Sequence, residues 1–164
     1  MPAPLPGTLV PFGSEAVVFR RTLRDSQKRV VATNGCFDVL HAGHLRYLTS
    51  ARELGDFLWL GINSDESVRQ LKGPLRPVFP AAERAELLLA LRVVDAVTIY
   101  HEVRATGFLG AASPDIYVKG GDYTPETLDA EERAALIACG AEIKILQLVP
   151  GRSTTDTLKK LSSQ

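Results

Sequence analysis

Short apolar runs alternate with longer amphipathic stretches along most of the chain, from Arg29 onward. The short runs are largely continuous in apolar residues, which is the pattern of strands that helices cover on both faces. Five such runs predict strands: Val30–Thr33, Phe57–Ile62, Ala96–Tyr100, Asp115–Val118 and Glu142–Leu148. Strands that alternate with helices in this way are typical of a parallel sheet with crossover helices.

The stretches between the strands carry helical periodicity and end signals. Leucine and alanine recur every third residue from Leu45 to Leu54, and Gly55 ends this helix. Further helices are predicted from Ser14 as N-cap to about Asp25, over Glu83–Leu91, over Glu126–Ala138 before Gly140, and after Ser153. The pattern therefore predicts a single doubly wound, Rossmann-like α/β domain with a five-stranded parallel sheet.

The first thirteen residues differ from the rest in composition. Prolines at positions 2, 4, 6 and 11 resist both helix and sheet. We therefore expect residues 1–13 to form a disordered arm outside the fold. The domain is expected to span residues 14–164, because no linker, repeat or low-complexity tract divides them.

Composition excludes several classes of protein. The 164 residues match the length of one domain, and 45% hydrophobic residues supply a core. Nineteen basic residues balance nineteen acidic ones, so the chain lacks the basic surface that nucleic-acid binding requires. Its most apolar stretch, residues 87–100, is interrupted by Arg92 and Asp95 and is too short to span a membrane.

Location and redox state follow from the N-terminus and the cysteines. The first fourteen residues have no positively charged flank before an apolar run, so they do not form a secretory signal, and we expect a cytoplasmic protein. Cys36 and Cys139 lie far apart in the sequence, which argues against a disulfide framework or a zinc site.

The segment from Thr33 to His44 carries the densest set of candidate functional residues. It leaves the first predicted strand and enters the next helix, which is the position of the ligand site in doubly wound sheets. Asn34, Gly35, Cys36 and Phe37 form the loop, and Gly35 allows close approach of a ligand to the backbone. The helix start offers amide groups to a phosphate, and His41 and His44 add two directed donors.

Other interpretations of this segment remain open. The two imidazoles are alternatively structural, each satisfied by neighbouring groups. Metal binding by the pair is less favoured because no acidic or cysteine partner lies at ligand spacing. A Walker loop is excluded because its Gly-Lys-Ser/Thr ending is absent. Asp38 is a candidate to orient a substrate hydroxyl, or else a turn residue that bonds nearby amides.

Three further segments offer groups suited to anions. Lys72, Arg76 and Arg84 lie in and after a stretch broken by glycine and proline, where a loop could close over a polyphosphate. Lys119, Gly120, Gly121 and Asp122 follow the fourth predicted strand, and Asp122 is a candidate acceptor for a ribose hydroxyl. Arg152, Ser153, Thr154 and Thr155 begin the last helix and offer a second anion site. The alternatives are a solvated basic loop, an ordinary turn and plain helix capping.

These motifs together resemble the nucleotidylyltransferase superfamily marked by His-x-Gly-His. The segment Asn34-Gly-Cys-Phe-Asp-Val-Leu-His-Ala-Gly-His44 looks most like the D-glycero-D-manno-heptose 1-phosphate adenylyltransferases of ADP-heptose synthesis. Four more segments match that family in order and spacing: Asn63-Ser-Asp65, Leu71-Lys-Gly73 with Arg76-Pro-Val78, Val118-Lys-Gly-Gly-Asp-Tyr123, and Arg152-Ser-Thr-Thr155. The resemblance covers about Arg29 to Leu161.

The resemblance implies an activity and a role for each residue. A sugar 1-phosphate would attack the α-phosphorus of ATP and release pyrophosphate, with Mg²⁺ bridging the triphosphate and no metal ligands from the protein. His41, His44 and Lys72 are then catalytic, because they stabilise phosphate charge. The nucleotide is expected to bind the loop 34–37, both histidines, residues 119–122 and residues 152–155, and the substrate to bind Asp38, Lys72, Arg76 and Arg84. Members of this family are commonly dimers, so we expect a homodimer.

Two features depart from the heptose enzymes. Phe79 stands where those enzymes usually carry asparagine, and we expect no sugar-kinase domain of the kind that is fused ahead of many of them. An enzyme similar to glycerol 3-phosphate cytidylyltransferase, which uses CTP, is therefore the alternative enzyme. The alternative from another class is a nucleotide-binding sensor without catalysis, which would need affinity but no donors directed at the transition state.

Overall fold

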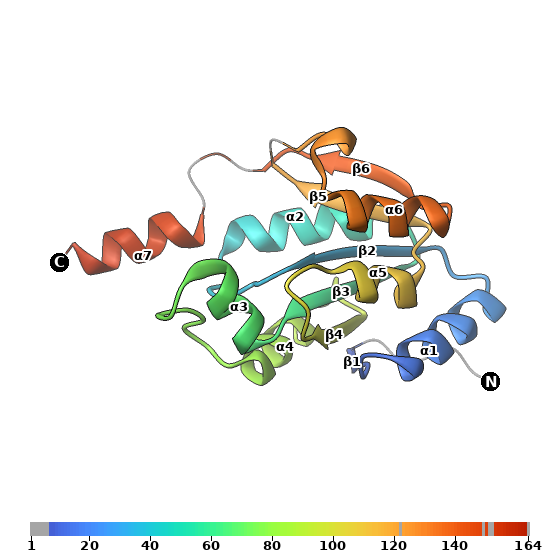
Figure 1. The fold of residues 1–164 in the computed structure, drawn as a ribbon, viewed down its shortest axis with the longest axis horizontal. Coiled ribbons are helices and arrows are strands. Elements are labelled where there is room, and N and C mark those ends of the chain that lie inside the picture. The colour runs from blue at the N-terminus through green and yellow to red at the C-terminus, as the bar shows by residue number, and fades with distance from the viewer. Residues whose placement is uncertain (1–6, 122, 149, 151–152, 164) are drawn as a thin grey trace.

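The computed structural model describes residues 7–121, 123–148, 150 and 153–163 (Figure 1). The strands are β1 (Thr8–Leu9), β2 (Val30–Gly35), β3 (Phe57–Asn63), β4 (Ala96–Tyr100), β5 (Ile116–Gly120) and β6 (Glu142–Leu146). The helices are α1 (Ser14–Asp25), α2 (Ala42–Arg52), α3 (Asp65–Lys72), α4 (Ala81–Leu89), α5 (Thr106–Ala112), the short 3-10 turn η1 (Pro125–Thr127), α6 (Ala130–Ala138) and α7 (Thr154–Ser162). The expected α/β class is confirmed.

All neighbouring strands are parallel, in the order β1-β4-β3-β2-β5-β6. The chain therefore runs outward from β2 in both directions, to β3 and β4 on one side and to β5 and β6 on the other. This is the doubly wound arrangement that the sequence predicts. The direction reverses between β2 and β5, so a ligand is expected beside the carboxyl ends of these two strands.

The prediction of five strands is wrong, because the described sheet has six. The additional strand is β1, and it lies inside the segment that sequence patterning placed outside the fold. Thr8 aligns with Ala96 of β4, and the amide of Val10 donates to Val97 O at 2.8 Å. Val10 is itself buried in the core. An edge strand bonds to one neighbour only, so a two-residue strand fits between the prolines and leaves no detectable pattern.

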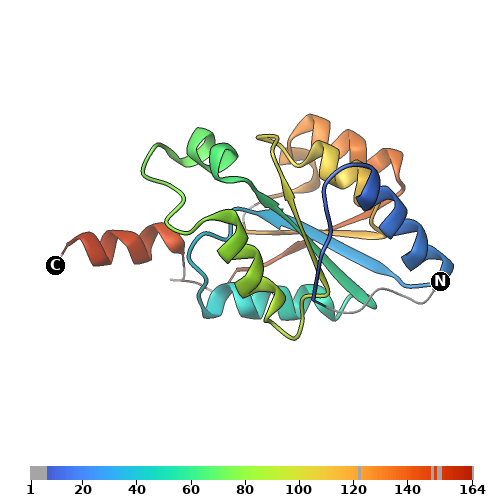
Figure 2. The ribbon, with the colours of Figure 1, turned by 90° about the horizontal axis from the view of Figure 1, so that it is seen from below.

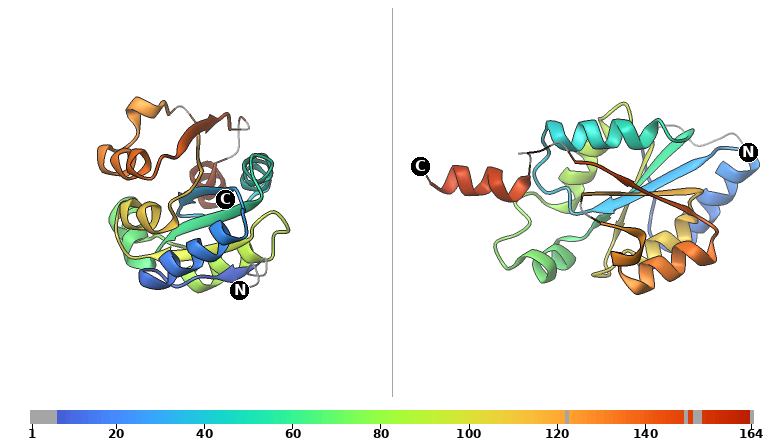
Figure 3. Two further views of the ribbon diagram at one scale, coloured as in Figure 1. Left: turned by 90° about the vertical axis from the view of Figure 1, so that its right-hand side faces the viewer. Right: turned by 90° about the horizontal axis from the view of Figure 1, so that it is seen from above.

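Helices cover both faces of the sheet (Figures 2 and 3). On one face α1, α5 and α6 pack over a core that includes Trp59 and Phe108. On the other face α2 and α4 pack over a second core that includes Leu48 and Leu58. Adjacent residues of β3 therefore contribute to opposite cores, which explains why the strand reads as one continuous apolar run.

Two helices lie toward the carboxyl ends of the strands. Helix α3 follows β3 directly and was not predicted, and Lys72 is its last residue. Helix α7 extends away from the sheet (Figure 1), and none of its described residues is buried. No helix in the described part of the chain is long and apolar enough to cross a membrane.

Candidate active site

Two adjoining cavities open beside the carboxyl ends of β2 and β5. The smaller cavity has a volume of about 270 Å³ and the larger about 410 Å³. Asn34, Gly35, Cys36, Phe37, His44, Lys119 and Thr154 line both. The topology therefore brings the first and fourth predicted strands together where the sheet changes direction.

Each cavity has its own lining in addition to the shared residues. The smaller cavity also contacts His41, Gly43, Tyr47, Gly120, Leu148 and Ser153. The larger cavity also contacts Asp38, Asn63, Leu71, Lys72, Arg76, Tyr100, Val103, Arg104, Tyr123, Glu132 and Thr155. The smaller cavity is thus built from glycines, rings and hydroxyls, whereas the larger one holds most of the charged groups.

The two histidines are fixed by the start of α2. His41 is the N-cap residue, and its Nδ1 accepts a hydrogen bond from Gly43 N at 3.1 Å. The Nδ1 atom of His44 accepts from His41 N at 3.3 Å, so the two side chains form a reciprocal capping box. The ring centroids lie 3.9 Å apart. A nitrogen that accepts a hydrogen bond carries no proton, so the proton of a neutral ring held in this way lies on Nε2.

His44 stays neutral well below physiological pH. Burial, helped by the neighbouring His41, lowers its pKa to about 4. Its Nε2–H is therefore a neutral donor at pH 7. The structural interpretation of the pair therefore describes the Nδ1 atoms, which cap the helix, and the chemical interpretation stays a prediction about the Nε2 atoms.

Gly120 is required by close packing at the end of β5. A Cβ atom at this position would lie 2.7 Å from Leu148 Cδ2 and 3.0 Å from the ring of Tyr47. Any side chain would therefore push apart two residues of the smaller cavity. Gly121 follows with a φ of 100°, which favours glycine, but it lines neither cavity.

A network of buried side chains underlies the larger cavity. Tyr117 donates to Asn34 Oδ1 at 2.6 Å, and Asn34 Nδ2 donates to the Tyr100 hydroxyl at 3.4 Å. Tyr100 in turn donates to Asn63 Oδ1 at 2.9 Å, and Asn63 Nδ2 donates to Ser67 Oγ at 2.7 Å. Burial raises the pKa of both tyrosines, so they remain protonated donors. The network connects the carboxyl end of β2 to α3.

Four cationic side chains line the larger cavity: Lys72, Arg76, Arg104 and Lys119. Lys72 ends α3, whereas Arg76 lies in the segment 73–80 that joins α3 to α4. Lys72 and Arg76 therefore line the same cavity from two neighbouring segments. Lys119 also lies over the ring of Tyr123, with Nζ 5.0 Å from the ring centroid.

Asp38 anchors the segment 73–80. Its carboxylate accepts hydrogen bonds from Val78 N at 2.8 Å, from Phe79 N at 3.1 Å and from the Arg76 guanidinium. These bonds outweigh the effect of burial and hold the pKa of Asp38 below its ordinary value. The side chain is fully buried, so it positions the segment that carries Arg76.

Arg84 is not placed for the direct substrate contact that the sequence predicts. Its side chain has no exposed surface and lines neither cavity. The guanidinium donates to Cys36 O at 2.6 Å, to Phe79 O at 3.0 Å and to Asp65 Oδ1 at 2.8 Å. Arg84 therefore ties the loop after β2 to the segment 73–80 and to α3.

The start of α7 lies against the same loop. Ser153 caps the helix by accepting from Asp156 N at 3.0 Å, and the Thr154 hydroxyl donates to Val39 O at 3.2 Å. Ser153 and Thr154 reach the smaller cavity, and Thr154 and Thr155 the larger. The predicted site residues Asp122 and Arg152 lie outside the described residues.

Several lining residues were missed by sequence reasoning. They are Tyr47, Leu71, Tyr100, Val103, Arg104, Leu148 and Glu132. Most lie on helices or after strands whose sequence patterns are those of ordinary core or surface positions. Asn63 carries a weak signal, since it is a polar residue that ends an apolar strand.

Cys36 and His101 add no activated side chain to the two cavities. Burial raises the pKa of the Cys36 thiol, so it stays protonated and is not an activated nucleophile. His101 is exposed after β4 and lines neither cavity. In the described part of the chain no group of three or more His, Cys, Asp or Glu side chains is placed to hold a metal ion.

Comparison with known proteins assigns the family. A cytidylyltransferase-like family profile matches residues 32–157. The bifunctional protein HldE of Syntrophotalea carbinolica is 48% identical over 134 residues, which cover 82% of this chain and 27% of that protein. HldE of Trichlorobacter lovleyi is 46% identical over 138 residues, covering 84% and 28%. This chain therefore spans little more than a quarter of the length of these relatives.

A solved structure supports the same assignment. The lipopolysaccharide core biosynthesis protein from Thermoplasma volcanium matches with a TM-score of 0.60 and 31% identity, over 74% of this chain and 97% of that one. The family match covers more than half of the chain and spans the loop after β2, the segment 73–80 and the start of α7. This chain belongs to the cytidylyltransferase-like family.

Proposed function

We propose that this protein transfers the adenylyl group of MgATP to a heptose 1-phosphate and releases pyrophosphate. The observation that carries the proposal is the pair of cavities that meet at His44 and Lys119. Two substrates that react with each other need adjoining sites with charge-stabilising groups at the junction. The HldE relatives and the resemblance to heptose 1-phosphate adenylyltransferases support the choice of substrates.

The linings suggest which substrate each cavity takes. The smaller cavity offers the apolar surfaces of Tyr47 and Leu148 and the start of α7, which suit a nucleoside and its phosphates. The larger cavity offers four cations, which suit the phosphate of the second substrate. We assign the nucleotide to the smaller cavity and the sugar phosphate to the larger.

The reaction itself is an in-line displacement at phosphorus. An oxygen of the sugar phosphate forms a bond to the α-phosphorus, while the bond from that phosphorus to the bridging oxygen breaks and pyrophosphate leaves. No general base is needed because the attacking group is already an anion at neutral pH. Catalysis then depends on positioning and on charge stabilisation.

Side chains at the junction and on either side of it supply that stabilisation. His41 and His44 donate from Nε2 to phosphate oxygens, and Lys72 neutralises charge on the α-phosphate. Asp38 and Arg84 act as positioning residues that hold the segment with Arg76 against the loop after β2. Mg²⁺ belongs to the MgATP substrate and screens the triphosphate, and the described residues offer no cage of their own for it.

A cytidylyltransferase is the second candidate, because the matching family profile is described as cytidylyltransferase-like. Pyrophosphate release should be measured with ATP or CTP, each combined with heptose 1-phosphate or glycerol 3-phosphate. We expect the highest kcat/KM with ATP and heptose 1-phosphate. Faster release with CTP and glycerol 3-phosphate would favour the second candidate, and nucleotide binding without any release would favour a sensor.

Phe79 allows a separate test of the sugar. Its side chain is 39% exposed, and it takes the place of an asparagine in the heptose enzymes. The residue lines neither cavity in this structure. We therefore expect Phe79→Asn to leave the ratio of kcat/KM for heptose 1-phosphate and glycerol 3-phosphate unchanged.

A further inference from the structure

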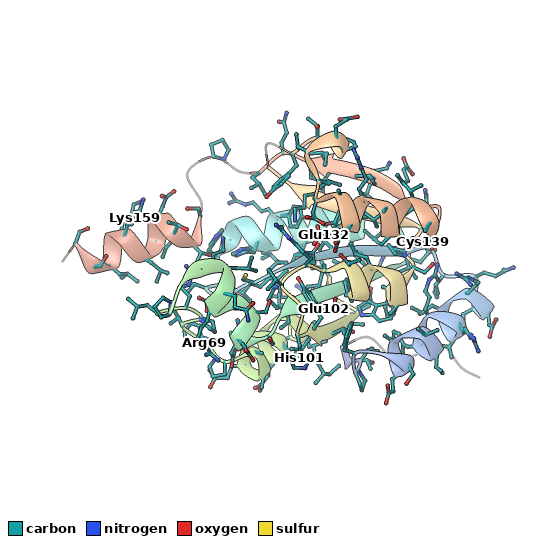
Figure 4. All side chains as sticks on the ribbon, in the orientation of Figure 1. Arg69, His101, Glu102, Glu132, Cys139 and Lys159 are labelled. Carbon is teal, nitrogen blue, oxygen red and sulfur yellow. The ribbon has the colours of Figure 1, made fainter. Side chains whose placement is uncertain are left out.

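Glu132 is a buried acid in a cavity otherwise dominated by cations. It lies on α6 (Figure 4) and is 6% exposed, yet it lines the larger cavity. Lys72, Arg76, Arg104 and Lys119 contribute to the same lining. In the described chain no basic side chain forms an ion pair with Glu132. The charges of this cavity thus include four cations and an anion that none of them neutralises directly.

The carboxylate of Glu132 has spare capacity to accept hydrogen bonds. Its Oε1 accepts from Ala105 N at 2.8 Å, and the described residues offer Oε2 no donor. A carboxylate has about four acceptor positions. A buried carboxylate with a single donor is incompletely compensated for its lost hydration, so a ligand that donates to it would be favoured.

The neighbouring polar groups are already engaged with each other. Asn34, Asn63, Tyr100 and Tyr117 bond in one chain, and Asn63 also donates to Ser67. Asp38 is saturated by the segment 73–80. Among the carboxylate and amide oxygens that line this cavity, Glu132 Oε2 is therefore the one that accepts no hydrogen bond from a described residue.

We propose that Glu132 is the residue that recognises the hydroxyl groups of the sugar phosphate. This inference rests on the proposed function and deepens it. The cations Lys72 and Arg76 take the phosphate end, while the carboxylate accepts one or two hydroxyls from the sugar ring. The arrangement also assigns an orientation, because a phosphate placed beside Glu132 would meet a like charge.

Glu132 also contributes to structure, and the test has to separate the two roles. Its bond to Ala105 holds the first residue before α5, which has no side-chain cap of its own. Glu132→Gln retains an oxygen at the place of Oε1 and the size of the side chain, but removes the charge. Glu131→Gln is the matched control, because Glu131 is the exposed neighbour on the same helix.

The experiment compares wild type, Glu132→Gln and Glu131→Gln by pyrophosphate release with heptose 1-phosphate and ATP. We expect Glu132→Gln to raise the KM for heptose 1-phosphate roughly tenfold or more, the effect of a lost hydrogen bond to a charged group. The KM for ATP and the melting temperature should stay close to those of wild type. Glu131→Gln should match wild type throughout.

Inorganic phosphate, tested as a competitive inhibitor against the sugar phosphate, supplies a second readout. It carries the charge but no sugar hydroxyl, so its inhibition constant should be the same in wild type and Glu132→Gln. An equal loss of affinity for inorganic phosphate and heptose 1-phosphate would overturn the inference in favour of a structural role. An unchanged KM for heptose 1-phosphate would overturn it outright. No release by wild type would overturn the proposed function itself, and the inference with it.

Discussion

His41 and His44 use opposite ends of the imidazole ring for different purposes. The Nδ1 atoms complete the capping box at the start of α2, and that fixes the proton on Nε2. The ring orientation is thus set before any substrate binds, which is the condition for low-cost stabilisation of a transition state. Two residues that serve as helix caps also serve, in our proposal, as donors to the reacting phosphates.

Removal of the Nε2 donors should reduce turnover more than binding. We expect His44→Ala and His41→Asn each to lower kcat about a hundredfold, or ~3 kcal/mol, with a much smaller change in the KM for ATP. Asparagine is a good N-cap residue, so His41→Asn should keep α2 intact. The double variant should lose less than the product of the two single effects, because both donors act on one polyphosphate.

Steady-state kinetics together with circular dichroism of each variant test this prediction. His101→Ala is the control, because His101 is exposed and lines neither cavity. Near-normal kcat in the two motif variants would show that the histidines are structural only.

The pH dependence of stability should reveal the buried His44. Its pKa of about 4 lies below the ordinary value of 6.5, so the unfolded chain binds more protons between these two values. The free energy of unfolding should therefore fall as the pH decreases from about 6.5 to about 4. Denaturant titrations at several pH values give this free energy for wild type and for His44→Gln. In this window it should change more steeply with pH in wild type than in the variant. If the free energy of unfolding changed with pH equally in the two proteins, the lowered pKa of His44 would be contradicted.

At the scale of elements, the sequence predicted those strands and helices whose hydrophobic pattern is long and regular. The five longer strands, β2 to β6, and the helices α1, α2, α4, α6 and α7 were found within a few residues. Helix α3 was missed because its apolar stripe is short, and Lys72 was therefore expected in a loop. Helix α5 was missed because Thr106–Ala112 contains two glycines, which disfavour helix in isolation.

Residues that line the cavities were predicted from the sequence where they lie within a recognisable motif, and were missed where they stand alone. The loop after β2 and the residues after β5 lie in contiguous stretches with glycine and charge, and the sequence showed them. Arg84 carries the same charge as Arg76, but only the packing shows that its guanidinium bonds three groups of the protein. Glu132 directly follows the exposed Glu131 on α6, and nothing in the sequence separates the two, so its burial was invisible before the fold was known.

Asp38 provides a test of how the segment 73–80 is held. Asp38→Asn replaces one acceptor oxygen by a donor that faces Arg76, so the variant should lose about 1–3 kcal/mol of stability. Amide hydrogen exchange at Val78 and Phe79 should increase, because both amides donate to this carboxylate. Exchange in β4 should not change. Equal protection of the Val78 and Phe79 amides in both proteins would show that other contacts hold the segment.

At the scale of the whole molecule, the doubly wound sheet explains why residues distant in sequence share a site. The chain leaves β2 and β5 on opposite crossovers, so the loops after these strands diverge and leave the two cavities between them. The two cores of the domain lie on opposite faces of the sheet, while the site lies at its carboxyl edge. Changes in the cores remote from that edge should therefore affect stability without affecting chemistry.

Val10 tests this separation and the six-stranded sheet together. Its side chain is 3% exposed beside β1, whereas that of Leu9 is 52% exposed. Val10→Ala should lower the free energy of unfolding by about 2 kcal/mol, because it leaves a cavity in the core. Leu9→Ala, the neighbouring control, should change it by no more than about 0.5 kcal/mol.

Both variants should retain kcat at a temperature where they are folded, since β1 lies at the edge of the sheet three strands from β2. Denaturant unfolding and pyrophosphate release measure the two quantities. A Val10→Ala variant as stable as wild type would mean that the first residues lie outside the fold, as their prolines suggest.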